Sequence, residues 1–239
     1  MSNLRRLLFA AMAAAALSAA SLLGVGTASA APNAVTPSDC PDVEVVFARG
    51  TFEGPGIGKV GTPFVDALRG RLPGQVVDVY AVNYPASVDF ARAVDGVADV
   101  SNHLNDMAAR CAATDIVLGG YSQGAAVSAY ATSDTVPAGY ALPAGLTGPL
   151  APAVADHVAA VALFGKPSAN VVSVLQRGAP PIVIGPAFVG KTIDLCAPED
   201  PICQPGALNR GAHSAYVTNG MADQAADFAA RQIAGRHGA

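Results

Sequence analysis

The residues of this chain that could do chemistry begin with Ser122, at the centre of the pentapeptide GYSQG (residues 120–124). An apolar β-branched run, residues 115–118, precedes this G-x-S-x-G motif, and an Ala-rich run typical of a helix, residues 125–130, follows it. In a nucleophile elbow a serine sits on a sharp turn between a strand and a helix, and the flanking glycines let the two backbones approach without a Cβ clash. In this context the motif predicts acyl transfer through a nucleophilic serine.

A nucleophilic serine needs a histidine as its base, and with this kind of elbow the chain order is serine, acid, histidine. Three histidines follow Ser122, namely His157, His213 and His237. His157 precedes the candidate acids at the far end of the sheet, and His237 lies in a Gly-rich tail. His213 comes directly before the last expected helix, where it can reach the carboxyl edge of a sheet, so we predict that it is the base. We expect His103, which lies mid-helix before the elbow, to be solvated.

The acid that orients the histidine must lie between the serine and the base. Asp200 is the preferred candidate, because a disulfide between Cys196 and Cys203 would close a short loop around it and fix its backbone. A misplaced carboxylate would leave the imidazole in the wrong tautomer. Asp194, inside a strand-like run, is the second candidate, and Glu199 is the third.

The oxyanion that develops during acyl transfer needs preorganised hydrogen-bond donors. One is predicted to be the backbone N–H of Gln123, the residue after the nucleophile. The second should come from a loop after an early strand, and residues 48–53 form the best candidate loop. Within this loop Thr51 offers both an amide and a hydroxyl, so we predict Thr51 as the second donor.

The chain has four cysteines, all after the first thirty residues, and an even number in an exported chain favours disulfides. Four cysteines allow three pairings. The favoured pairing joins Cys40 to Cys111, which ties the first strand to a helix end, and Cys196 to Cys203, which closes the Pro-rich loop. A zinc site is the competing interpretation, but the cysteines have neither the CxxC spacing nor a clustered histidine pair. We therefore expect no metal.

The elements that must position these residues alternate between strands and helices. Strand-like runs that are apolar almost throughout predict a parallel sheet that helices cover on both faces. The segment from 137 to 152 is an irregular Gly/Pro/Leu loop, which either flanks a substrate groove or is an ordinary surface connection. The expected strands are 43–48, 76–82, 115–119, 158–164 and either 181–184 or 192–195, and the expected helices are 63–72, about 23 residues from Ser87, and 214–233.

The first thirty residues are predicted to be a secretory signal peptide rather than part of the fold. Arg5 and Arg6 precede an apolar stretch, residues 7–23, and a small-residue cleavage site ends at Ala30. Cleavage there leaves one domain, residues 31–239, in a secreted protein. The full chain has 14 basic and 18 acidic residues, so loss of two arginines leaves 12 against 18, a net charge of −6. This charge argues against a nucleic-acid partner, which requires a basic surface.

With these residues in place, the chain resembles the cutinase family of serine esterases, in particular the cutinase-like proteins that actinobacteria export. The likeness extends over nearly the whole mature domain. It implies an α/β-hydrolase fold of three α/β/α layers, with a central, mainly parallel sheet and no large lid. The segments that carry the resemblance are residues 48–51, 120–124, 194–196, 200–203 and 212–213.

The resemblance also implies a function and a set of site residues. It implies hydrolysis of carboxylic esters with short to medium acyl chains, without a cofactor or metal, by a monomer that makes transient contact with a lipid surface. The alternatives are acyl transfer or phospholipase and lipase activity with the same triad, and a non-catalytic cell-envelope protein. Carried over residue by residue, the family implies Ser122, Asp200 and His213 as the triad, Thr51 and Gln123 as oxyanion donors, and Cys40–Cys111 and Cys196–Cys203 as disulfides.

Two features depart from the fungal members of the family. Those enzymes have a serine at the position of Thr51, whose additional methyl group could narrow the oxyanion side of the cleft. The segment 204–211 is also more polar than the apolar binding loop typical of them, which argues against the plant polyester as substrate. Arg210 in this segment is either a ligand for a lipid phosphate or carboxylate, or a solvated loop residue.

Overall fold

A computed structural model describes residues 40–136, 141–142 and 144–238. The predicted signal peptide and its cleavage site at Ala30 lie outside the described residues, as do positions 137–140 and 143 of the Gly/Pro/Leu loop. Among the helices that the structure describes, none has the length and apolar character needed to cross a membrane.

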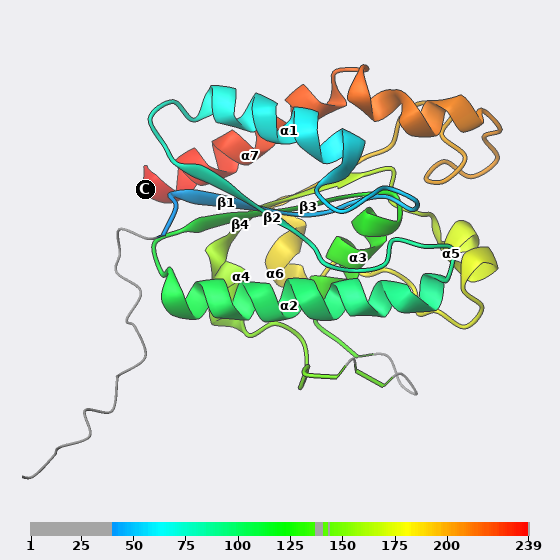
Figure 1. Cartoon of the computed structure of the whole chain (residues 1–239), viewed down its shortest axis with the longest axis horizontal. Coiled ribbons are helices and arrows are strands. Elements are labelled where there is room, and N and C mark those ends of the chain that lie inside the picture. The colour runs from blue at the N-terminus through cyan, green and yellow to red at the C-terminus, as the bar shows by residue number, and fades with distance from the viewer. Residues whose placement is uncertain (1–39, 137–140, 143, 239) are drawn as a thin grey trace, which may run out of the picture. The chain divides into compact units, whose positions relative to one another are not determined.

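The described residues form one sheet of five parallel strands in the order β2-β1-β3-β4-β5 (Figure 1). Every residue of the three central strands is buried, which explains why their sequences are apolar almost throughout. Parallel pairing brings the carboxyl ends of all strands to one edge, where the predicted site residues follow them. The strands are β1 (Val43–Ala48), β2 (Val77–Ala81), β3 (Asp115–Tyr121), β4 (Val158–Phe164) and β5 (Thr192–Leu195).

Helices cover both faces of the sheet, so the expected three-layer α/β/α architecture is confirmed. Helices α1 and α7 lie on one face, and α2, α3, α4 and α6 lie on the other (Figure 1). The helices are α1 (Gly58–Arg71), α2 (Ala93–Arg110), α3 (Gln123–Ala131), α4 (Pro152–His157), α5 (Ala169–Leu175), α6 (Pro186–Val189) and α7 (Met221–His237), with 3₁₀ segments η2 (Phe90–Arg92) and η3 (Arg210–Val217).

The strands divide their side chains between two cores. Along β1, Val45 and Phe47 join the core under α1 and α7, whereas Val46 and Ala48 join the core under α2 and α3. This alternation is the two-residue period of a strand. Burial on both faces fixes the strand register, because a slip by one residue would exchange the two faces. The carboxyl edge of the sheet is therefore a well-defined platform for the site.

Some predicted elements have different limits in the structure. Of the two candidates for the last strand, residues 192–195 form β5, whereas residues 181–184 form no strand. Two side chains at the end of α3 bind the backbone of this region instead. Tyr130 Oη donates to the Pro180 carbonyl, and Ser133 Oγ donates to the Val183 carbonyl. The helix expected from Ser87 begins only with the 3₁₀ turn η2, and α2 has 18 residues.

The expectation that His103 is solvated is wrong. Its side chain is largely buried, and Nε2 lies 2.8 Å from a carboxylate oxygen of Glu44 on β1. The imidazole also stacks on the Tyr80 ring, with 3.5 Å between ring centroids. Glu44 is a polar residue in an otherwise apolar strand, so it requires a buried partner, and His103 provides it.

The structure contains both favoured disulfides. Cys40, before β1, is bonded to Cys111 at the end of α2, with the Cα atoms 5.6 Å apart. Cys196, directly after β5, is bonded to Cys203, with the Cα atoms 5.7 Å apart. All four cysteines are therefore paired, the first pair at the start of the sheet and the second pair beside its carboxyl edge.

Candidate active site

Ser122 occupies the turn between β3 and α3 in a backbone conformation that a serine rarely adopts, with φ 55° and ψ −117°. Positive φ in a residue with a Cβ is strained, and such strain persists where the surroundings hold it. Here the Ser122 amide donates to the Phe164 carbonyl at the end of β4, at 2.9 Å. The serine is thus held on a nucleophile elbow, as the motif predicts.

The two glycines of the motif are required by direct backbone contact. A Cβ on Gly120 would lie 2.3 Å from the Gly124 carbonyl oxygen. A Cβ on Gly124 would lie 2.0 Å from the Ala48 carbonyl oxygen, at the end of β1. Both distances are well below van der Waals contact and involve backbone atoms that have little freedom to move. The glycines therefore pack the first turn of α3 against β3 and against the loop after β1.

The structure brings together Ser122, His213 and Asp200. His213, in η3, places Nε2 at 2.9 Å from Ser122 Oγ and Nδ1 at 2.8 Å from Asp200 Oδ2. A carboxylate accepts hydrogen bonds, so Nδ1 carries the proton and Nε2 is free to accept from the serine hydroxyl. This is the geometry in which an imidazole acts as general base toward a serine.

Asp200 is completely buried, and its carboxylate is fully bonded. The Ile202 amide donates to Oδ1 at 2.9 Å, and the Tyr216 hydroxyl donates to Oδ2 at 2.5 Å beside the His213 contact. Burial and the hydrogen bond to Asp200 raise the pKa of Tyr216 well above its ordinary value, so this hydroxyl remains a donor. Because a buried carboxylate needs such partners, these bonds fix the direction in which Asp200 faces His213.

The two rival acids do not reach the histidine. Asp194 is exposed on β5 and pairs with Lys166, with 3.2 Å between Nζ and Oδ2. Glu199 is exposed in the disulfide loop, where its backbone has φ 65°. The loop between Cys196 and Cys203 thus presents Asp200 to the site and Glu199 to solvent.

Tyr121, which precedes the nucleophile, supports the histidine from a second side. Its ring lies against the His213 imidazole with 5.0 Å between centroids, and its hydroxyl donates to the His213 carbonyl at 2.5 Å. Burial is the main cause that raises the pKa of Tyr121. The roles of Tyr121 and Tyr216 were not predicted from the sequence. Only the proximity of Tyr121 to the motif pointed to it, and nothing in the local sequence distinguished Tyr216 from a core residue.

The loop after β1 is held by Arg49, to which the sequence alone also gave no role. Its buried guanidinium donates to the backbone carbonyls of Glu53 at 2.8 Å, Val82 at 3.2 Å and Tyr84 at 2.6 Å. The Glu53 carboxylate in turn accepts from the amides of Gly50 at 2.6 Å and Lys59 at 2.9 Å. These bonds connect residues 49–53 to the segment after β2 and to the start of α1.

The two predicted oxyanion donors are the backbone amides of Thr51, in this loop, and of Gln123, at the start of α3. Within the described residues the Thr51 amide has no hydrogen-bond acceptor, while the next amide, of Phe52, donates to the Ala86 carbonyl at 2.7 Å. Gln123 begins α3, and the first amides of a helix have no acceptor within it. The Gln123 side chain is buried and donates to the Ser87 carbonyl at 3.0 Å. Both amides are therefore available to a ligand.

Across the part of the chain that the structure describes, no group of three or more His, Cys, Asp or Glu side chains is arranged to hold a metal ion. The Ser122 site contains one imidazole and one carboxylate, which are bonded to each other.

The fold and the site together define the class of protein. A parallel sheet between helical layers, with a nucleophile elbow after β3 and an acid and a histidine following in chain order, is an α/β-hydrolase fold. Within this class the chain belongs to the cutinase family, since a model of the Cutinase family matches residues 39–233. The resemblance inferred from the sequence is thereby confirmed.

Named relatives agree with this assignment. The chain is 48% identical over 215 residues to carboxylesterase Culp1 of Mycobacterium tuberculosis, a match that covers 90% of this chain and 92% of that protein. It is 47% identical over 222 residues to phospholipase Culp4 of the same species, covering 93% and 90%. The structure of Trichoderma reesei cutinase in complex with a C11Y4 phosphonate inhibitor is 32% identical, with a TM-score of 0.60 over 81% of this chain and 77% of that one. The chain is a carboxylic ester hydrolase.

Proposed function

We propose that this chain is a secreted serine esterase whose catalytic triad is Ser122, His213 and Asp200. The observation that carries the proposal is the unbroken series of hydrogen bonds from Ser122 Oγ through the imidazole to Asp200, at a serine held in a positive-φ turn. His213 Nε2 takes the hydroxyl proton as Ser122 Oγ attacks the ester carbonyl carbon. Asp200 stabilises the imidazolium that forms.

The negative charge on the carbonyl oxygen is stabilised by the amides of Thr51 and Gln123, each worth about 3 kcal/mol if it resembles other oxyanion donors. The imidazolium then gives its proton to the departing alcohol oxygen, which leaves an acyl-serine. A water molecule, deprotonated by His213, attacks the acyl carbon. The carboxylic acid leaves and the Ser122 hydroxyl is restored.

The enzyme acts, in this proposal, on esters of short to medium acyl chains, as a monomer and without a cofactor or metal. Residues 1–30 direct export and are removed, and residues 31–239 form the single mature domain. Two disulfides support a location outside the cytoplasm, because disulfides persist in oxidising compartments.

A chromogenic ester series, with the mature protein and its Ser122→Ala variant, tests the assignment. We expect Ser122→Ala to lower kcat by about 10⁵ to 10⁶, and a phosphonate inhibitor to add its mass to the wild-type protein at Ser122 only. Turnover that survives in Ser122→Ala would contradict the proposal. Product analysis with added alcohol acceptors distinguishes hydrolysis from acyl transfer by the same triad.

Exposed apolar side chains at the same edge of the sheet favour contact with a lipid surface. Phe52, next to Thr51, is 80% exposed, and Leu208, between Asp200 and His213 in the chain, is 90% exposed. Large apolar side chains this exposed often mark interaction sites when they flank a functional site. The double variant Phe52→Ser with Leu208→Ser should lose binding to lipid vesicles, as measured by co-sedimentation. If the wild-type protein and the double variant sediment equally with the vesicles, this contact is ruled out.

Phospholipid hydrolysis is the second candidate function, and one exposed cation favours it. Lys59 Nζ lies 5.4 Å from the centroid of the Tyr121 ring and 3.4 Å from Ser214 Oγ, beside His213. A phosphate headgroup bound with its ester at Ser122 would find this charge at the site. Lys59→Gln should lower kcat/KM for an anionic phospholipid more than for an uncharged ester, with a weaker dependence on salt. An equal effect on both substrates would exclude Lys59 from headgroup recognition.

A further inference from the structure

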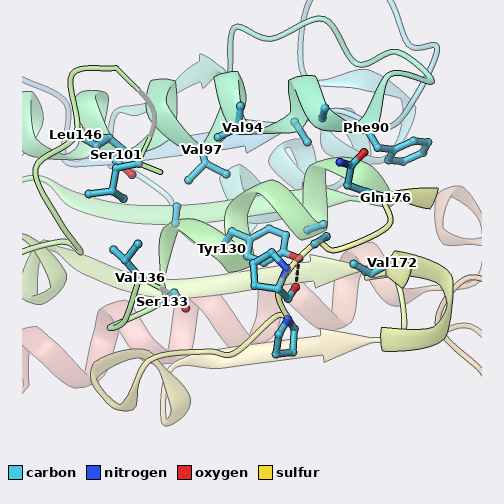
Figure 2. A pocket seen from close by; sticks show the side chains of 18 of the residues that line it. Phe90, Val94, Val97, Ser101, Tyr130, Ser133, Val136, Leu146, Val172 and Gln176 are labelled. Atoms are coloured by element: carbon cyan, nitrogen blue, oxygen red, sulfur yellow. Dashed lines mark hydrogen bonds between the residues drawn. The ribbon is translucent and has the colours of Figure 1, made fainter. Parts of the chain in front are cut away.

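A large apolar cavity of about 460 Å³ lies between α2, α3 and α5, on the face of the sheet opposite α1 and α7. Figure 2 shows side chains from all three helices and from the adjoining loops turned into it. None of the described residues that line it is charged. A cavity of this size falls within the range of about 300 to 1,000 Å³ that small-molecule pockets occupy. Its lining fits an uncharged, apolar occupant rather than a sugar or an anion.

One wall of the cavity is an apolar stripe on α2 and the turn before it. Phe90, Val94, Val97 and Ser101 follow each other at intervals of three and four residues, so they share one face of the helix. This face lies beside the one that Gly96 and Val100 bury in the core, and Val94 on it remains 36% exposed. The stripe therefore borders open space, whereas Leu104, one turn further along, is fully buried in the core.

The opposite wall comes from α3, the helix that begins at the nucleophile. Ala126 and Ala131 line the cavity with small side chains, and Tyr130 lines it with its ring. The Tyr130 hydroxyl donates to the Pro180 carbonyl at 2.5 Å, so its polar end is satisfied. Small residues on α3 thus leave the volume open, and the hydroxyl of Tyr130 is bonded to the protein.

Two residues that line the cavity lie close to the proposed catalytic residues. Gln123, one of its lining residues, directly follows Ser122, so their Cα atoms are only about 3.8 Å apart. Pro167, another lining residue, comes two residues after Gly165. A Cβ on Gly165 would lie 3.0 Å from His213 Cε1 and 3.1 Å from Asp200 Oδ2. One end of the cavity is therefore next to the nucleophile and its histidine.

We infer that the cavity is the binding site for the acyl chain of the ester, so that the chain runs inward between α2 and α3 instead of along the surface. The inference rests on the proposed function, because it requires an acyl group on Ser122. At about 30 Å³ for a group the size of a water molecule or a methylene, the volume admits on the order of 15 carbons. The cavity then accepts medium-length unbranched acyl chains, at the upper end of the proposed range, and its volume sets an upper limit of length.

A chain-length series with a filled cavity provides the first test. Val97→Phe places a ring in the open space, and Val76→Phe makes the same exchange at an exposed position before β2, at the other edge of the sheet. We expect the ratio of kcat/KM for decanoate to that for acetate to fall about tenfold in Val97→Phe, because several buried methylenes lose their site. The ratio should stay at the wild-type value in Val76→Phe. A folded Val97→Phe protein with the wild-type ratio would overturn the inference.

A second test does not depend on the variant folding. The wild-type protein is treated with a decyl phosphonate, which attaches the alkyl chain at Ser122, and the adduct is crystallised. The inference expects the alkyl chain beside Val97 and Ala126. An adduct at Ser122 whose chain lies on the surface beside Phe52 or Leu208 would overturn this inference alone. If no adduct forms at Ser122, the proposed function fails with it.

Discussion

The two faces of the sheet carry side chains from the same strands but are filled differently. Under α1 and α7 the rings of Phe47, Phe64, Phe164 and Tyr216 pack with centroids between 5.6 and 6.3 Å apart. Under α2 and α3 the core is mostly aliphatic, and the 460 Å³ cavity lies on this side of the sheet. The tightly packed face is the one that holds the acid, because Tyr216 belongs to its core and bonds Asp200.

This difference suggests a division of tasks between the faces. The aromatic core contains Tyr216 and Tyr121, whose hydroxyls bond Asp200 and the His213 carbonyl. The open side leaves room for the part of a substrate that does not react. The proposed nucleophile, Ser122, lies in the turn between the end of β3 and the start of α3.

The largest effect should come from the acid that the packed face supports. Asp200→Asn keeps the shape of the side chain but favours the wrong tautomer of His213, so kcat should fall by about 10⁴. Asp194→Asn is the matched control, because Asp194 pairs with Lys166 and not with the histidine. Steady-state kinetics on a soluble ester measures both. Loss of activity in the control alone would move the acid to Asp194.

The stability of the two faces can be compared with one kind of substitution. Phe64→Ala removes a fully buried ring from the packed face and should lower the free energy of unfolding by about 3 to 5 kcal/mol. Phe90→Ala removes a partly exposed ring from the cavity wall and should cost about 1 kcal/mol or less. Urea unfolding followed by circular dichroism gives both values. Equal losses would mean that the cavity wall is as well packed as the aromatic core.

Tyr216→Phe separates the two roles of a single residue of the packed face. The ring remains in the core, but Asp200 loses one of its donors, and a hydrogen bond to a charged group is worth about 1.5 to 3 kcal/mol. We expect kcat to fall about tenfold to a hundredfold. Because the ring is kept, the substitution should disturb packing much less than Phe64→Ala does. A variant with unchanged kcat would show that His213 and the Ile202 amide are sufficient to orient the carboxylate.

The smallest effect concerns alkaline pH. Burial raises the pKa of Tyr121 and Tyr216 in the folded protein above the value of about 10 for an unfolded tyrosine. The folded state then holds these protons more tightly, so their contribution to stability is complete below pH 10 and is lost as the pH rises above it. The midpoint of thermal unfolding should be constant from pH 7 to 9 and fall between pH 10 and 12. The fall should be shallower in Tyr216→Phe, and an identical slope would contradict the role of Tyr216.

Much of this arrangement could be predicted from the sequence, because local signals specify it. Apolar β-branched runs indicated the central strands, and the chain order of serine, acid and histidine left few candidates. Asp200, His213 and Ser122 lie together in the structure as that order suggests. The motif also indicated where strand and helix pack closely, because a Cβ at Gly120 or Gly124 would overlap backbone atoms.

The roles of Arg49 and His103 and the presence of the cavity could not be predicted, because they depend on contacts between segments that are distant in the sequence. Arg49 resembled an ordinary loop cation until its three carbonyl partners, from two loops, were in place. His103 could not be identified as a buried partner without Glu44, which is 59 residues earlier. The stripe that contains Val94 and Val97 has the same periodicity whether it packs against a core or borders a cavity. The volume on its inner side is therefore invisible in the sequence.

The contact between Gly124 and the Ala48 carbonyl has a consequence for how the enzyme can move. A Cβ at Gly124 would lie 2.0 Å from the Ala48 oxygen and 2.5 Å from the Arg49 oxygen, so α3 packs directly on the start of the loop that carries Thr51. We therefore expect Ser122 and both proposed oxyanion donors to move together. Turnover of a small soluble ester should accordingly show no dependence on solvent viscosity from closure of this loop, and any gating of the reaction must come from entry of the acyl chain.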